Sequence, residues 1–352
     1  FAANVTVYGV VDTGLVYTHQ SFGGALPTNG DSSKFSMDSG VLGASKFGFK
    51  GTEDLGDGYS VSFQLENGFK SDTGALSGAD DNKLFDREAR LSLNTPYGTV
   101  SFGRMGALTS GAGTYDVFQA TGDALDGGNA NYIGTGYWFS RDRYDNMITL
   151  VTPEANGFTG YAQYSFQTKG TENANERANT RYAALGLTYK AGALEAVVVA
   201  DTVLRTSTEE KTYSDAQAYS FGVNYDFGVT KAFFGAQYGN HENIEFEFNT
   251  ATTGTAKTYN NYFKGYNLHI GAATPLPCGT LTVSAYYGDY EAENDNTVTA
   301  KKYGFGAMHE YAISKRTTFY TGAGFSQAEL EQADSAARVK GVNVTLGLNH
   351  KF

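Results

Sequence analysis

The chain has 352 residues, with 44 Gly, 25 Tyr and 24 Phe but only 5 Pro and 1 Trp. Its formal net charge of −11 and its pI of about 4.9 argue against nucleic acid as a partner. No stretch approaches the roughly 18 consecutive apolar residues that a membrane-spanning helix needs. The mean hydropathy of −0.35 does not exclude a membrane barrel, whose lipid-facing residues alternate with polar ones and cancel in any window average. Abundant Tyr, Phe and Gly with little Pro favours many strands and tight turns.

The first strand-like segment places Val5, Val7 and Val11 on one parity and Thr6 and Asp12 on the other. A period of two puts these sets on opposite faces of a strand. Counting such segments predicts about 16 strands of about 9 to 15 residues, which is long enough for tilted strands to span a membrane. Clear further examples are residues 59–66, 219–227, 266–272 and 303–308.

Two kinds of connection alternate between these segments. Short turns carry the Gly, Pro, Asn and Asp that tight hairpins require, and the other connections are mostly longer and more polar. Short turns on one side and long loops on the other are typical of an up-and-down outer-membrane barrel, with both termini on the short-turn side. Short turns are expected at 54–58, 96–98, 153–157, 190–192, 227–229, 275–279 and 314–316. Long loops are expected at about 19–39, 71–83, 106–142, 169–178, 206–213, 244–259, 293–297 and 329–338.

A soluble β-sandwich is the alternative architecture. Sandwich strands are shorter, about 5–6 residues, and their cores favour Val, Ile and Leu. Here the apolar parity is rich in Tyr and Phe, and the other parity is rich in Gly, Ser, Thr, Asn and Gln, which suits a water-filled lumen. The sequence therefore predicts an all-β fold, a single antiparallel transmembrane β-barrel domain of about 16 strands over residues 1–352.

The last strand-like segment ends on Phe352, which shares the parity of Val342 and Leu348. We expect Phe352 on the outward face, where this strand pairs with the first one and closes the barrel. The chain enters a strand-like segment at once, and we expect an export leader to have been removed.

Motifs spread over the whole chain lie at residues 5–12, 45–58, 85–89, 97–104, 143–146 and 349–352. Together they resemble the trimeric general diffusion porins of Gram-negative β-proteobacteria. Two positions depart from the family pattern: Lys46 stands where Arg is usual, and residues 105–108 differ from the usual continuation after Arg104. The resemblance implies a homotrimer in outer-membrane lipid, passing small hydrophilic solutes and ions, with no cofactor. It also implies that Phe352 is read by the assembly machinery.

The connection at 106–142 is the third long loop, and the resemblance implies that it folds into the lumen and constricts it. A structureless loop of this length is usually functional or disordered. Small residues at 106–113, an amphipathic piece at 115–119 and a Gly/Asn-rich run at 126–129 are consistent with a lumen loop. The alternative is an external loop lying over the mouth.

Strand parity assigns the charged residues of the lumen. Taking Phe47 and Phe49 as lipid-facing places Lys46 and Lys50 inward. The resemblance makes Arg87 a lumen residue, whereas parity points it outward, and a bulge or a break in pairing near residue 88 would reconcile the two. The predicted basic wall comprises Lys46, Lys50, Arg87, Arg90 and Arg143. The predicted acidic side comprises Glu66 and the loop residues Asp116, Asp123 or Asp126.

Opposed charges in a narrow aqueous pore orient dipolar solutes, and an excess of fixed cations concentrates anions. The leading hypothesis is therefore a passive diffusion channel with a modest anion preference at the constriction. One alternative is a substrate-selective channel for small anions such as carboxylates. A remote alternative is an outer-membrane barrel enzyme, for which His241 and Glu242 form the one weak candidate pair. The five His are widely spaced, without metal-like pairing, so neither a metal site nor enzymatic activity is predicted.

Overall fold

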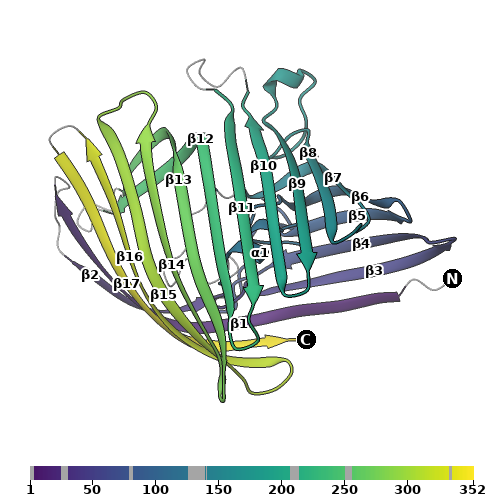
Figure 1. The fold of residues 1–352 in the computed structure, drawn as a ribbon, viewed down its shortest axis with the longest axis horizontal. Coiled ribbons are helices and arrows are strands. Elements are labelled where there is room, and N and C mark those ends of the chain that lie inside the picture. The colour runs from purple at the N-terminus through teal and green to yellow at the C-terminus, as the bar shows by residue number, and fades with distance from the viewer. Residues whose placement is uncertain are drawn as a thin grey trace.

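The computed structural model describes residues 4–24, 31–78, 82–125, 139, 141–206, 214–249, 256–332 and 335–352. These residues form one antiparallel sheet of seventeen strands, in which β17 pairs with β1 and closes a barrel (Figure 1). The first strands are β1 (Asn4–Gly24), β2 (Ser32–Ser39), β3 (Lys46–Gly56), β4 (Tyr59–Gly68), β5 (Glu88–Thr95), β6 (Gly98–Gly106), β7 (Arg143–Val151), β8 (Phe158–Ser165) and β9 (Arg181–Ala191). The others are β10 (Leu194–Leu204), β11 (Ala216–Asp226), β12 (Lys231–Asn249), β13 (Ala256–Leu276), β14 (Gly279–Ala292), β15 (Val298–Ala312), β16 (Thr317–Gln332) and β17 (Ser335–Lys351).

Strands β2 and β3 occupy one position in the barrel wall. Both pair with the same edge of β1, where Ser39 of β2 lies opposite Thr13 and Lys46 of β3 lies opposite Val10. Seventeen strands minus this one duplication give 16 positions around the circumference. The prediction of a 16-stranded antiparallel barrel is confirmed.

Side-chain exposure follows the predicted parity. Val5 and Val7 are 57% and 59% exposed, whereas Asp12 on the other parity of β1 is fully buried. The same outward row of exposed apolar residues continues through β17, from Val342 to Leu348. The barrel therefore has an apolar outer face and a polar inner face, as lipid outside and water inside require.

All seven predicted short turns fall between strands, from the hairpin of β3 and β4 to that of β15 and β16. Three of the predicted long loops are shorter than expected, because the strands run into them. β12 continues to Asn249 and β13 begins at Ala256, inside the predicted loop 244–259. Ile244, Phe246 and Phe248 alternate with Glu there, a period-two pattern that the local polarity obscured. The loops expected at 19–39 and 329–338 are shortened in the same way by β1, β2, β16 and β17.

The first and last strands, β1 and β17, meet at the barrel seam. Gly9 and Phe352 exchange two backbone hydrogen bonds of 3.0 Å each. A Cβ at Gly9 would overlap the Phe352 ring, so a glycine here makes room for the terminal aromatic residue. Phe352 is 46% exposed.

The short helix α1 (Phe118–Gly122) belongs to the connection between β6 and β7. It lies within the ring of strands, against β10, β11 and β12 (Figure 1). The 3-10 turn η1 (Glu176–Ala178) precedes β9. None of the described helices is long and apolar enough to cross a membrane.

Candidate functional site

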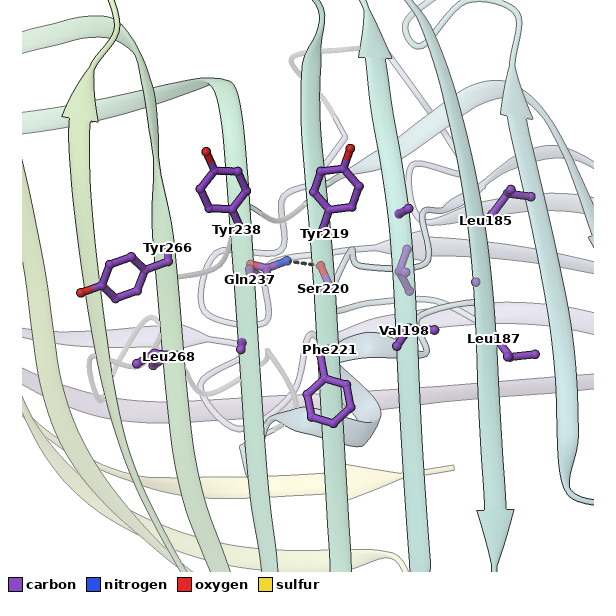
Figure 2. Close-up of a pocket in the computed structure, with 14 residues that line it drawn as sticks. Leu185, Leu187, Val198, Tyr219, Ser220, Phe221, Gln237, Tyr238, Tyr266 and Leu268 are labelled. Atoms are coloured by element: carbon purple, nitrogen blue, oxygen red, sulfur yellow. Dashed lines mark hydrogen bonds between the residues drawn. The ribbon is translucent and has the colours of Figure 1, made fainter.

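One groove of about 710 Å³ lies on the outer face of the barrel over β9–β13. Its ridges are apolar and aromatic side chains, among them Leu185, Val198 and Tyr219 (Figure 2). Ser220 and Gln237, which are joined by a hydrogen bond of 2.8 Å, belong to the opposite, buried parity. None of the described residues that line this groove carries a charge. It therefore belongs to the apolar outer belt of the barrel.

Inside, the residues 107–125 between β6 and β7 pack against the wall formed by β8–β13, which we call the loop-bearing wall. Glycines on this wall admit the loop backbone. Gly222 and Gly235 are register partners on β11 and β12, and a Cβ built on Gly122 of α1 would lie 3.0 Å from the Gly222 Cα. Similarly, a Cβ on Gly186 would meet Leu108 at 2.8 Å. The helix thus rests directly on strand backbone, which larger side chains would prevent.

Apolar side chains fill the contact between the loop and this wall. Leu108 and Phe118 are fully buried and pack in one cluster with Val197 and Val199 of β10. Side-chain amides of the wall bind the loop backbone, which would otherwise be buried without partners. Gln163 Oε1 accepts from the Leu108 N–H at 3.0 Å, Asn224 Nδ2 donates to the Thr121 carbonyl at 2.9 Å, and Gln237 Oε1 accepts from the Phe139 N–H at 2.6 Å.

A buried ion triad anchors the end of the connection. The Arg141 guanidinium, 7% exposed, donates to Asp201 Oδ1 from Nε at 2.7 Å and to Glu242 Oε2 from Nη1 at 2.8 Å. Burial acts to lower the pKa of Arg141, but the attraction of Asp201 and Glu242 outweighs it and raises that pKa well above its ordinary value. Because both acids come from separate strands, β10 and β12, the triad ties the loop to two parts of the wall.

The other side of the lumen holds a cavity of about 600 Å³, which we call the charged cavity. Residues 111–113 of the loop, with Ala124 and Leu125, form one side of it. Its titratable lining residues are Lys46, Arg87, Arg143, Lys351 and Glu310.

Three of the predicted basic residues line the charged cavity. Lys46 Nζ lies 3.2 Å from Glu66 Oε2, and Arg87 Nε lies 2.7 Å from Glu66 Oε1, so one carboxylate serves two cations. Tyr8 donates a further hydrogen bond of 2.9 Å to Glu66. Within the described residues, Arg143 forms no ion pair with a carboxylate. Glu66 therefore belongs to the basic wall, and Arg143 has no ionic partner in the described part of the chain.

The conflict over Arg87 is resolved by a break in pairing. β5 begins at Glu88, so Arg87 precedes the strand and strand parity does not govern it. Its backbone N–H donates to the Glu66 carbonyl at 3.2 Å, and its side chain turns to the same residue. The structure thus places Arg87 on the lumen side, as the resemblance implied.

Two predicted basic residues lie away from the charged cavity. Lys50 is exposed, with Nζ 5.1 Å from the centre of the Tyr8 ring. Arg90 is held by Gln64 at 2.9 Å and Glu88 at 3.7 Å, and its guanidinium lies 5.5 Å from the Tyr115 ring of the loop. Arg90 therefore contacts the base of the loop, where Glu88 accepts from the Thr114 N–H at 2.7 Å.

The loop acids predicted to oppose the basic wall are engaged elsewhere. Asp116 accepts from the backbone N–H groups of Gln119 and Ala120, at 3.4 and 3.3 Å, in the first turn of α1. Asp123 is 2% exposed and lies 3.4 Å from His269 Nε2 of β13. Neither lines the charged cavity. Asp126 lies outside the described residues. The physical reason is local: unpaired loop backbone at the ends of a short helix binds short acidic side chains, with Asp116 before the start of α1 and Asp123 directly after its end, where it accepts from the Leu125 N–H at 2.9 Å.

Three charged residues of the lumen are not among those predicted from the sequence: Lys351, Glu310 and Arg141. Lys351 and Glu310 lie on the inward parity of β17 and β15, one residue from exposed Phe352 and Tyr311, so parity counting could have found them. Arg141 lies in a connection without periodicity, and no sequence signal marks its partners.

The remote enzyme hypothesis depended on His241 and Glu242. These neighbours turn to different partners: His241 binds Glu293, and Glu242 binds Arg141. Among the described residues no group of three or more His, Cys, Asp or Glu could hold a metal ion.

Comparisons with known proteins agree with this geometry. A family described as Gram-negative porin matches residues 1–329. An outer membrane porin protein of Bordetella pertussis is 31% identical over 99% of this chain and 94% of its own length. Outer membrane porin protein 32 of Delftia acidovorans is 32% identical over 55% of this chain and 52% of its own length.

Solved structures share the fold. The anion-selective porin from Comamonas acidovorans superimposes with a TM-score of 0.66 at 22% identity, covering both chains completely. The trimer form of OmpT, an outer membrane protein of Vibrio cholerae, gives a TM-score of 0.60 at 18% identity, again over both complete chains. With a family match over most of its length, the chain belongs to the Gram-negative porin family and is a non-enzymatic channel of the outer membrane.

Proposed function

We propose that this channel passes small hydrophilic solutes and ions by passive diffusion with a modest preference for anions. The charged cavity carries the proposal. Four cations line it, Lys46, Arg87, Arg143 and Lys351, against the single carboxylate Glu310. Together with Glu66, which pairs with two of the cations, these groups comprise four cations and two carboxylates, an excess of two positive charges.

This local charge is opposite to the net charge of −11 of the whole chain. Fixed charge acts over about 8 Å at physiological ionic strength, so the groups beside the path decide the selectivity more than the total does. An excess of cations in a confined aqueous passage raises the local concentration of anions. The similar solved structure from Comamonas acidovorans is that of an anion-selective porin, which supports the same preference.

The same proposal assigns the loop of residues 106–142 to the constriction. Two contacts support this assignment: its described part packs against the loop-bearing wall, and residues 111–113, Ala124 and Leu125 border the charged cavity. Solutes then pass between the loop and the basic wall, and not through the centre of an empty barrel.

Reversal-potential measurements in planar bilayers, with a tenfold KCl gradient across the membrane, test the proposal. If anions permeate more readily than cations, the reversal potential should have the sign of the chloride equilibrium potential. A potential of the opposite sign contradicts the assignment, and the absence of ion conductance contradicts a diffusion channel altogether.

Arg143, which has no carboxylate partner among the described residues, gives the carboxylate-selective alternative a specific basis. Flux of a small dicarboxylate into proteoliposomes distinguishes the two. Linear dependence on concentration supports simple diffusion, whereas saturation supports a binding site for carboxylates.

We further propose a homotrimer. The solved trimer form of OmpT shares the fold, and the outer face carries many exposed apolar side chains suited to lipid or to a second copy. The mass of the detergent-solubilised protein, measured by native mass spectrometry, tests this: three chains support the proposal and one chain contradicts it.

A further inference from the structure

The wall of the barrel has an irregular segment, residues 40–45, between β2 and β3. Thr13 and Val10 of β1 lie opposite Ser39 and Lys46, so only two residues of β1 face these six. The surplus backbone cannot remain in the sheet, and it must leave on one face or the other.

The segment turns into the lumen. Val41 is fully buried and belongs to a cluster with Leu125 of the constriction loop and with Met308 and Tyr320 of the wall. Leu42 packs against that cluster. The segment and the constriction loop, which are about 80 residues apart in the chain, thus share one apolar contact inside the barrel.

Asp12 holds the segment in this position. The Asp12 carboxylate is fully buried and accepts from the N–H groups of Val41 and Gly43, each at 3.0 Å. It also accepts from Tyr320 Oη and Asn349 Nδ2, each at 2.8 Å. A buried carboxylate that accepts four hydrogen bonds is fully satisfied, and each bond to a charged acceptor is stronger than a neutral one.

Glycines of the seam provide the space. Gly14 and Gly347 are register partners on β1 and β17. A Cβ on Gly14 would lie 2.6 Å from Tyr320 Oη and 3.1 Å from Val41 Cγ2. The inward turn is therefore accommodated by the neighbouring strands.

We propose that residues 40–45 are a second constriction element, a lip that meets the loop at Leu125, borders the conducting path beside it and sets the cross-section together with it. Leu42, Gly43 and Ala44 line the charged cavity beside Leu125 and the cations. The lip thus places small and apolar groups next to Lys46 and Arg143. This inference rests on the proposed conducting path through the charged cavity, and Asp12 is its positioning residue.

Cysteine modification tests the lip. The background is Cys278→Ser, which removes the exposed native thiol. Ala44→Cys places a thiol on the exposed part of the lip, and Asn343→Cys is the matched control, since Asn343 has the inward parity of β17 but does not line the charged cavity. Both channels are treated with a neutral and an anionic methanethiosulfonate reagent, and modification is verified by mass.

Modification at Ala44→Cys is expected to lower single-channel conductance by about half or more, because added bulk at the narrowest cross-section controls the current. Modification at Asn343→Cys is expected to leave conductance nearly unchanged. The proposal that the lip constricts the path is contradicted if the Ala44→Cys protein is modified without loss of conductance, or if it is not modified in the open channel. The reversal potential of the Cys278→Ser parent reports the anion preference separately, so failure of the two proposals is distinguishable.

Asp12→Asn in the Ala44→Cys background tests positioning. Asparagine keeps the volume but cannot accept from all four donors. The loss of conductance on modification is expected to shrink relative to the parent, because the lip is released from the path. An unchanged loss in a correctly folded barrel contradicts the positioning role of Asp12, and the single variants remain informative where the double variant does not fold.

Discussion

The loop-bearing wall and the charged cavity use the same inward parity for opposite purposes. The loop packs against the loop-bearing wall as a helix packs in a protein core. Glycines allow close approach of the backbones, and buried amides and the Arg141 triad bind the loop. Around the charged cavity, Lys46, Arg87 and Arg143 face space large enough for water and solutes. The difference shows that a porin lumen is in part a packed interior and only in part a channel.

Charge pairing differs in the same way. The positive charge of Arg141 is outnumbered by two carboxylates, so Arg141 attaches the loop and adds no net positive charge to the lumen. Lys46 and Arg87 share one carboxylate, and Arg143 has none among the described residues, so the cavity keeps an excess of positive charge. The comparison predicts that changes on the loop-bearing wall alter conductance and stability, and that changes at the cavity alter selectivity.

The largest effect is expected from Arg141→Met. It leaves Asp201 and Glu242 buried without a cation, at a cost of about 3–5 kcal/mol. The end of the loop should detach, giving a larger and noisier conductance and a lower unfolding temperature. Single-channel recording and thermal unfolding measure the two effects.

Arg181→Met is the matched control for Arg141, because Arg181 pairs with Glu176 at 2.6 Å, an acid that is largely exposed. It should change stability by no more than about 1 kcal/mol. The triple variant Arg141→Met, Asp201→Asn, Glu242→Gln should recover part of the lost stability. Equal behaviour of the Arg141 and Arg181 variants would show that the triad does not anchor the loop.

The next effect concerns selectivity. Replacing Lys46, Arg87 and Arg143 together with Gln removes three of the four cations lining the cavity. The ratio of anion to cation permeability should fall several-fold, measured from reversal potentials. Lys50→Gln is the control, since Lys50 lies outside the cavity and should change the ratio little. An unchanged ratio in the triple variant would mean that the basic wall does not control selectivity.

A smaller effect is expected from Gly222→Ala, which tests the docking of α1. The added Cβ would lie 3.1 Å from the Cα and N of Gly122, so the helix must shift away from the wall. We expect a modest fall in conductance and a stability loss of about 1–3 kcal/mol. Gly341→Ala, whose Cβ would meet only the Ser326 hydroxyl, is the control. Identical conductance in both variants would argue against direct contact between helix and path.

The smallest effect on conduction is expected at Phe352, which lies at the outer seam and not at the cavity. Phe352→Ala should leave single-channel conductance unchanged but lower the yield of assembled barrel in the outer membrane. Quantifying folded protein by its resistance to unfolding in detergent gels checks this. A normal yield would count against a role of the terminal ring in assembly.

Much of the fold could be predicted from the sequence, because alternation such as Val5, Val7 and Val11 reports directly which face meets lipid. The tight turns were located by the same reasoning, since hairpins restrict their residues to few types. The strand extensions near Asn249 and Ala256 are not predicted, because the polar composition of residues 244–259 obscures the period-two pattern of their apolar side chains.

The site was harder to predict. Parity placed Lys46 and Glu66 inward, but it could not show that they pair with each other and with Arg87. Inward glycines such as Gly222 were interpreted as polar lumen surface, whereas the structure uses them to seat the loop. Asp123 was predicted to face the basic wall and instead faces His269, because contacts across the barrel depend on loop conformation, which periodicity does not encode.

The most direct test of the account is the reversal potential of the unmodified channel in a tenfold KCl gradient. The excess of two positive charges among these groups predicts a potential of the chloride sign. In the Lys46, Arg87 and Arg143 triple variant one cation remains against two carboxylates, so the potential should move past zero towards the potassium sign. A potential of the potassium sign in the unmodified channel would contradict the account.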